Sequence, residues 1–215
     1  MFRSKSFNNI NQPSVFGHLT HAKSASDINK TVFDARTFIT IRRVGVEEIY
    51  GITQRIINNS QGWEYNNSSN FPDDEQKKWN GRHNYACDML LNIGRCMKHY
   101  ADIRKIVFFV AYFQGVPVGV LWFDPNYECE IPEVDYLATH CGIRNCGVLL
   151  MEYAVNESRQ LGRGGQLKLT PLDNAIPAYL KMGFTELSGS THLYLNPAEN
   201  NKWDCRNPNH FRYKN

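Results

Sequence analysis

Residues 131–150 read IPEVDYLATHCGIRNCGVLL, and this stretch decides the fold. Its first ten residues, 131–140, predict a β-strand. The residues after Gly147 place Leu149, Leu150 and Tyr153 at the spacing of one helix face. The sequence therefore predicts a strand, a glycine-containing turn and a helix in direct succession.

The turn between this strand and this helix can bind an anion. A helix N-terminus carries free backbone N–H groups and the positive end of the helix dipole, which together suit a phosphate or a pyrophosphate. Glycine lets a ligand approach the backbone closely, and Arg144 adds a positive charge. An ordinary structural turn is the alternative interpretation.

The segments on either side predict alternating strands and helices. The clearest is a hairpin, in which β-branched and aromatic residues flank the turn Gln114-Gly115. Predicted strands are 37–44, 106–113, 116–123, 166–170, 184–187 and 192–195, and predicted helices are 46–58, 73–100 and 174–182. Gly81 and Gly94 are expected to break or bend the helix over 73–100.

Residues 175–184, AIPAYLKMGF, form a second motif about thirty residues beyond the turn. The two motifs together resemble the GNAT superfamily of N-acetyltransferases, whose acyl-CoA loop reads Q/R-x-x-G-x-G/A and whose later helix reads A-I-x-x-Y-x-K-x-G-F. The segment from Arg144 to Leu149 matches two of the three marked loop positions, with Leu149 where the family has Gly or Ala. The later motif matches almost fully, although Leu172 stands at the family's Asn position and Asn174 lies two places after it.

This resemblance implies a mixed α/β fold in one domain, with a central, mostly antiparallel sheet that is splayed between strands four and five and flanked by helices. It also implies acetyl-CoA as co-substrate in that split, and no metal. The main chain of strand four would bind the pantetheine arm, because an unpaired strand edge offers N–H and C=O groups to an amide-bearing chain. The implied cofactor-binding residues are Leu137, Ala138, Thr139, Arg144, Asn145, Cys146, Gly147, Val148 and Asn174.

Two side chains are expected to carry the chemistry. Tyr179 matches the family tyrosine that stands near the CoA sulfur as general acid. Glu133 lies eleven residues before Arg144, the spacing at which histone acetyltransferases of this superfamily place their general base. Period-two alternation puts Glu133, Asp135 and Leu137 on one strand face, so Asp135 is the second candidate for the base. Trp63 and Tyr65 are expected near the acceptor site.

Composition limits which partners and which compartment are expected. The chain has 215 residues and a net charge of +3, which argues against a nucleic-acid partner or a membrane partner. Its longest apolar run, 106–113, is far shorter than the ~20 residues that span a bilayer. Six cysteines without metal-ligand spacing are expected as free thiols in a reducing, cytoplasmic compartment.

The domain boundaries follow from composition as well. Residues 1–35 are basic and rich in Ser and Asn, so they predict a disordered arm or a targeting or secretion signal that would export the chain. Residues 36–196 form the predicted acyl-CoA-dependent domain, and 197–215 are expected as a C-terminal tail.

The functional hypothesis is acetyl transfer from acetyl-CoA to a primary amine by direct attack in a ternary complex. A protein lysine or N-terminus is slightly favoured over a small amine such as an antibiotic or a polyamine. The alternative is a non-catalytic module of the same fold that binds acyl-CoA or a protein partner. The sequence does not predict the oligomeric state.

Overall fold

A computed structural model of the chain describes residues 38–60, 74–97, 105–127, 131–186, 189–207 and 210–214. The predicted arm, 1–35, and the aromatic residues Trp63 and Tyr65 lie outside these ranges. No helix in the described ranges is long and apolar enough to cross a membrane.

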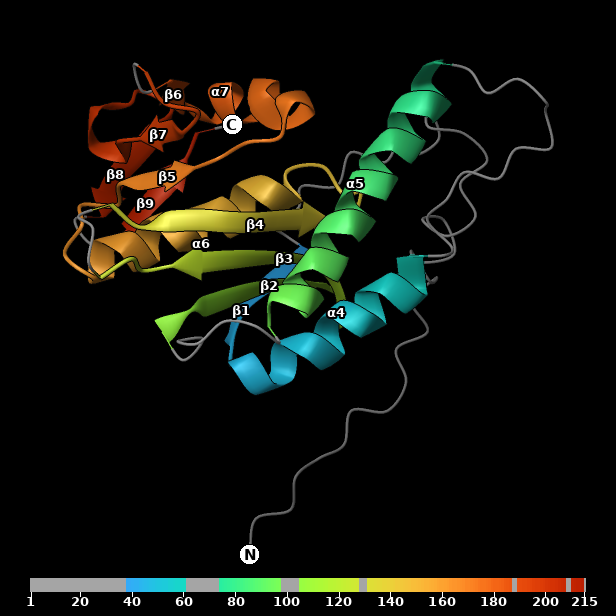
Figure 1. The fold of residues 1–215 in the computed structure, drawn as a ribbon. Coiled ribbons are helices and arrows are strands. Elements are labelled where there is room, and N and C mark those ends of the chain that lie inside the picture. Colours follow the sequence, from blue (N-terminus) through green and yellow to red (C-terminus); the bar gives the residue numbers. More distant parts are fainter. Residues whose placement is uncertain are drawn as a thin grey trace, which may run out of the picture.

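The main element is a seven-stranded sheet with the order β1-β2-β3-β4-β5-β7-β6 (Figure 1). Its strands are β1 (Ile39–Val44), β2 (Val107–Phe113), β3 (Val116–Asp124), β4 (Glu133–Thr139), β5 (Leu167–Leu169), β6 (Thr185–Glu186) and β7 (Leu193–Leu195). All neighbouring strands are antiparallel except the pair β4 and β5. This sheet confirms the predicted mixed α/β class.

The sheet is split between β4 and β5. These two strands pair at only two positions, Glu133 with Lys168 and Val134 with Leu169. Beyond Val134, no described strand pairs with the edge of β4 that faces away from β3. This is the opening between the fourth and fifth strands that the resemblance implies.

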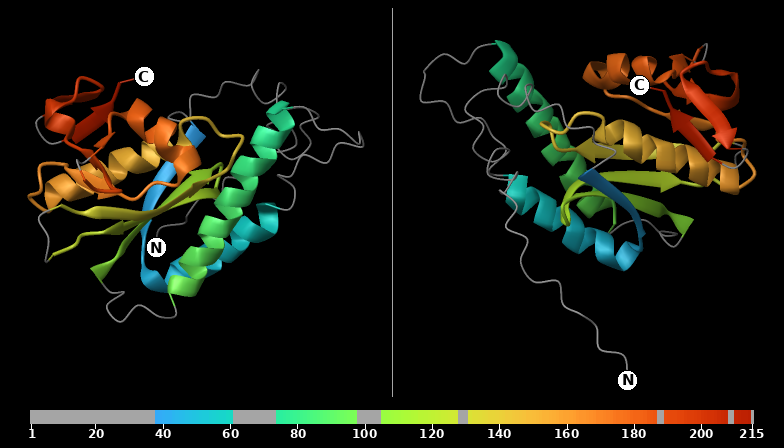
Figure 2. Two further views of the ribbon diagram at one scale, coloured as in Figure 1. Left: turned by 45° about the horizontal axis from the view of Figure 1, so that its top comes forward. Right: turned by 180° about the vertical axis from the view of Figure 1, so that it is seen from behind.

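Helices cover both faces of the sheet. Helices α4 (Val46–Ser60) and α5 (Asp74–Cys96) lie on one face, and α6 (Cys146–Gln160) lies on the other (Figure 1 and Figure 2). Because β2 and β3 are covered on both faces, nearly all of their side chains are buried, and their sequences are almost continuously apolar. The core therefore consists of two apolar layers, one on each side of the sheet.

Helix α5 is continuous over 23 residues, so the expected break at Gly81 or Gly94 is absent from the described helix. A glycine inside a helix costs about 1 kcal/mol relative to alanine. Trp79, Leu90 and Ile93 are buried along the same helix. Burying side chains of this size stabilises the helix by more than the two glycines cost.

A β-bulge in β4 changes which side chains share a face. Trp122 pairs with Tyr136 and Phe123 pairs with Val134, so Asp135 is the extra residue. Val134 consequently packs in the same apolar layer as Leu137, although period two would separate them. The expectation that Glu133, Asp135 and Leu137 share one face by simple alternation is therefore wrong.

Residues beyond 196 belong to the same folded unit. They form a short turn, η3 (Pro197–Glu199), and a hairpin of β8 (Trp203–Asn207) and β9 (His210–Tyr213). Trp203 and Phe211 are buried in the core layer beneath α6. The segment expected as a tail thus contributes to the core.

Candidate active site

A cavity of about 680 Å³ lies where the split in the sheet opens. One wall is the end of β4 with the turn that follows it. The opposite walls come from α5 and from the segment that contains η2 (Asp173–Ala175) and α7 (Ile176–Met182). The turn after β4 lies between α5 and α7 (Figure 2).

Most of the residues predicted to bind the cofactor, together with the predicted acid, line this cavity. They are Leu137, Ala138, Thr139, Asn145, Gly147, Val148, Asn174 and Tyr179. Arg144 is exposed in the turn and does not line the cavity. Cys146 is fully buried, and burial raises the pKa of its thiol to about 12.

The start of α6 presents backbone donors to the cavity. Asn145 is the N-cap residue with φ of 63°, a left-handed conformation that asparagine tolerates better than most residues. The first full helical bond runs from the N–H of Leu149 to the carbonyl of Asn145 at 3.1 Å. The N–H groups of residues 146–148 therefore have no helical acceptor and lie at the positive end of the helix dipole.

Helix α5 braces the turn from the other side. A Cβ on Gly142 would lie 2.6 Å from Trp79 Cη2, so the turn and the indole ring are in close contact. The N–H of Gly142 donates to Nδ1 of His140 at 2.9 Å. Burial lowers the pKa of His140 to about 3, so its ring is neutral and can accept this bond. Arg82 of α5 also lines the cavity and lies over the Trp79 ring.

The structure shows where the residues that depart from the family motif lie. Leu149 is buried in the core layer under α6 and does not line the cavity. Leu172 and Asn174 both line the cavity, so the asparagine still reaches its wall from two places further along the chain.

Tyr179 projects from α7 into the same cavity. Its ring packs edge-on against Phe184, with 5.6 Å between the ring centroids. Burial raises the pKa of Tyr179 to about 12. The phenol therefore stays protonated throughout the physiological range and can act as a proton donor.

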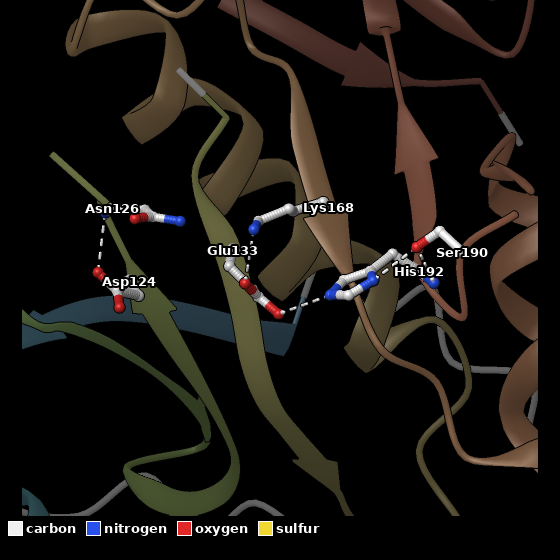
Figure 3. A network of polar contacts seen from close by, with 6 residues as sticks. All are labelled: Asp124, Asn126, Glu133, Lys168, Ser190 and His192. Carbon is white, nitrogen blue, oxygen red and sulfur yellow. Dashed lines mark hydrogen bonds and ion pairs between the residues drawn. The ribbon is translucent and has the colours of Figure 1, made fainter. Parts of the chain in front are cut away.

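Glu133 lies at the start of β4, where β4 still pairs with β5. Its carboxylate contacts Lys168 Nζ at 3.0 Å and His192 Nε2 at 3.8 Å (Figure 3). It is not among the residues that line the cavity. Asp135 does not line the cavity either, but it is two residues closer to Leu137, the first cavity residue of the strand.

A cysteine also lies in the cavity wall. Cys141 lines the cavity, but burial raises the pKa of its thiol to about 12, so little of the nucleophilic thiolate forms near neutral pH. Within the part of the chain that the structure describes, no group of three or more His, Cys, Asp or Glu side chains could hold a metal ion.

Comparison with known proteins gives matches among solved structures only, since neither a family-level match nor a curated protein match is found. The PaiA N-acetyltransferase of Thermoplasma acidophilum, in complex with coenzyme A, is 16% identical with a TM-score of 0.43, covering 73% of this chain and 96% of that one. An N-acetyltransferase of Staphylococcus aureus is 15% identical with a TM-score of 0.47, covering 74% of this chain and 97% of that one.

A nourseothricin acetyltransferase is 26% identical over 44% of this chain and 66% of its own, with a TM-score of 0.36. These three structures overlap with the chain only in part. The strand order and the split of the sheet are features of this chain's own structure and do not depend on these matches.

Proposed function

We propose that this protein is an N-acetyltransferase of the GNAT type that transfers the acetyl group of acetyl-CoA to a primary amine. The observation that carries this proposal is the cavity at the split of the sheet. It combines an unpaired strand edge, a helix N-terminus and a protonated tyrosine in one space. The similar solved structures include N-acetyltransferases, one of them in complex with coenzyme A.

Each part of acetyl-CoA has a matching group in this cavity. The N–H groups of residues 146–148 suit the pyrophosphate, and the side chains of Arg82 and Lys181 add positive charge along the walls. The free edge of β4 over 137–139 can pair with the amides of the pantetheine arm in the manner of an added strand. These contacts would direct the thioester along β4 toward the point where β4 and β5 meet.

The transfer itself needs a neutral amine and a proton for the leaving thiolate. Tyr179 can supply that proton, because its phenol remains protonated at neutral pH. Glu133 and Asp135 lie on either side of Val134, where the pairing of β4 with β5 ends, and are our candidates for the carboxylate that takes the proton from the amine. We propose direct attack on bound acetyl-CoA, since the thiol of Cys141 is a poor nucleophile here.

The experiment measures acetyl-CoA binding and acetyl transfer separately. Calorimetry tests binding, and release of the CoA thiol tests transfer to a panel of lysine peptides, protein N-termini, polyamines and aminoglycoside antibiotics. Direct transfer predicts intersecting initial-velocity patterns, whereas an acetyl-enzyme would give parallel lines. Binding without transfer to any amine would favour the non-catalytic module, and absence of binding would exclude both functions.

Tyr179→Phe tests the acid in the same assay. The substitution removes only the hydroxyl, so acetyl-CoA should still bind. Turnover should fall by roughly 10²-fold, the lower range for a lost general acid. The loss should be smaller for acyl donors whose leaving thiol is more acidic, because such thiolates need no proton. An equal loss for all donors would contradict the assignment.

A further inference from the structure

Three carboxylates converge at the closed end of the split, and their hydrogen bonding differs. Asp124, at the end of β3, accepts from the N–H of Asn126 at 2.8 Å (Figure 3). Glu133, its register partner on β4, is held by Lys168 at 3.0 Å. Asp135 has a buried oxygen, Oδ2, with no hydrogen-bond partner among the described residues. Of the three, Asp135 is the carboxylate that has a buried oxygen without a hydrogen-bond partner among the described residues.

The backbone places Asp135 close to the cavity, although Asp135 is not itself one of the lining residues. It is the bulged residue of β4, and a bulge redirects a side chain and interrupts the ladder with the neighbouring strand. Pairing with β5 stops at Val134, so Asp135 is the first residue of β4 on the open side of the split. Leu137 already lines the cavity and lies about 7 Å further along the strand, at ~3.3 Å per residue.

Charges from three strands act on this carboxyl group. Burial, the charge of Glu133 and the charge of Asp124 together raise the pKa of Asp135 to about 7, while Lys168 on β5 opposes the rise. His192 contacts Glu133 from the segment before β7 and therefore acts on Asp135 only through Glu133. A carboxylate in this environment is a stronger base than an exposed aspartate and is still largely ionised slightly above neutral pH.

We infer that Asp135 is the general base, and that Glu133, fixed by Lys168, is a positioning residue that sets the charge around it. The inference rests on the proposed acetyl transfer. In the step, the amine nitrogen forms a bond to the carbonyl carbon of acetyl-CoA and loses one proton to Asp135. The C–S bond then breaks, and the departing thiolate takes a proton from Tyr179. Solvent accepts the proton of Asp135 and restores that of Tyr179, so the products are an acetamide and free CoA.

The test measures kcat/KM for the amine as a function of pH. It compares variants in which a carboxylate is replaced by its neutral amide. Asp135→Asn should lower kcat by roughly 10²–10⁴-fold with acetyl-CoA affinity unchanged. Glu133→Gln and Asp124→Asn should remain far more active and should move the acidic limb of the profile to lower pH, because each removes a negative charge that raises the proton affinity of Asp135. Asp88→Asn, at an exposed carboxylate of α5, is the control and should leave the profile unchanged.

A second measurement does not depend on activity. NMR titration of the wild-type protein with ¹³C-labelled aspartate should show one carboxyl titrating close to pH 7, and that signal should be missing from Asp135→Asn. Retained turnover in Asp135→Asn would overturn the inference, as would the absence of such a titration. If the proposed acetyl transfer itself is wrong, the wild type will release no CoA thiol. This outcome distinguishes a wrong function from a wrong general base.

Discussion

Two glycines that follow β4, Gly142 in the turn and Gly147 in the first turn of α6, have different roles at the scale of single residues. Gly142 is needed by the protein, because any side chain there would overlap the indole of Trp79. Gly147 faces a space that the protein leaves open, since a Cβ there would come no closer than 3.7 Å to Leu137. The fold therefore leaves room for a side chain at Gly147, and we expect the absence of one to serve the proposed ligand.

This difference predicts opposite outcomes for two alanine variants. Gly147→Ala should fold normally and gain up to about 1 kcal/mol in the free energy of unfolding, because alanine favours a helix. Its acetyl-CoA affinity should fall about tenfold or more, since the methyl group occupies the path to the backbone N–H groups. Gly142→Ala should lose about 1–3 kcal/mol of stability through overpacking. Urea titration and calorimetry measure the two effects, and unchanged affinity in Gly147→Ala would move the phosphates elsewhere.

Asp135 gives a pH-dependent prediction on stability. Its pKa is about 7 in the folded protein and 3.8 for an unperturbed aspartate, so the folded state binds more protons between these values. Its stabilising contribution is therefore full below pH 3.8 and is lost as the pH rises through 7. Asp135→Asn should be more stable than the wild type at pH 8, with the difference vanishing near pH 4. Thermal unfolding at both pH values measures this, and a difference of the opposite sign would contradict the burial of this charge.

At the scale of elements, the C-terminal hairpin holds the helix that carries Tyr179. The carbonyls at the end of α7 accept hydrogen bonds from side chains of the segment beyond residue 196. Lys202 donates to the carbonyl of Leu180 at 2.9 Å, Tyr213 to that of Lys181 at 2.9 Å, Trp203 to that of Met182 at 2.9 Å and Asn200 to that of Gly183 at 2.7 Å. These bonds satisfy acceptors that a helix end otherwise leaves without partners.

Trp203→Phe tests this role of the hairpin. The substitution leaves the Met182 carbonyl buried without its donor, which should cost about 1–3 kcal/mol of stability. Tyr213→Phe removes a more exposed bond and should cost less, about 0.5–1.5 kcal/mol. Because Tyr179 lies on the same helix, turnover should fall more than acetyl-CoA affinity in the first variant. Wild-type stability of both variants in urea titration would show that these bonds do not hold α7.

The elements differ in how far the sequence predicts them. The β2–β3 hairpin and helix α6 follow from local signals, namely a turn at Gln114-Gly115 and a helical spacing of apolar residues. The bulge at Asp135 depends on the register with β3, which no local pattern encodes. The β8–β9 hairpin has no partner in the main sheet, so its short polar and aromatic strands give no alternation to detect.

The sequence also predicts only part of the candidate site, and the rest depends on contacts between distant segments. The turn can be predicted from its place between a strand and a helix, and Tyr179 from the family motif that the sequence resembles. Arg82 reaches the cavity, and Trp79 contacts the turn at Gly142, because α5 crosses the end of β4, a contact between segments about sixty residues apart. Choosing between Glu133 and Asp135 requires knowing which carboxylate is bound by Lys168, and that contact depends on the pairing of β4 with β5.

At the scale of the whole molecule, the cavity lies between two parts of the sheet that share little backbone pairing. Strands β1–β4 form one part and β5–β7 the other, joined at two residue pairs. A ligand that contacts the β4 edge and α7 together would link these parts. Ligand binding should therefore stabilise the whole fold and not the turn alone.

Acetyl-CoA should raise the melting temperature accordingly. At one hundred times Kd, binding adds about 2.7 kcal/mol to the free energy of unfolding. For a domain of this size that corresponds to a rise in Tm of about 5–10 °C. Differential scanning fluorimetry measures it, with Gly147→Asp as the control whose added charge and side chain should abolish the shift. An equal shift in Gly147→Asp would place the ligand outside this cavity.

The attachment of the C-terminal hairpin to α6 also has a consequence for folding kinetics. Asn156 bonds to the backbone of Phe211 and Glu152 to that of Tyr213, across 55 and 61 residues of chain. Contacts of such sequence separation form slowly, because a long loop must close before they contribute. We expect the hairpin to dock after the main transition state, so that Asn156→Ala accelerates unfolding and leaves the refolding rate nearly unchanged. A refolding chain would then complete its sheet first and gain its affinity for acetyl-CoA in a later, separate phase.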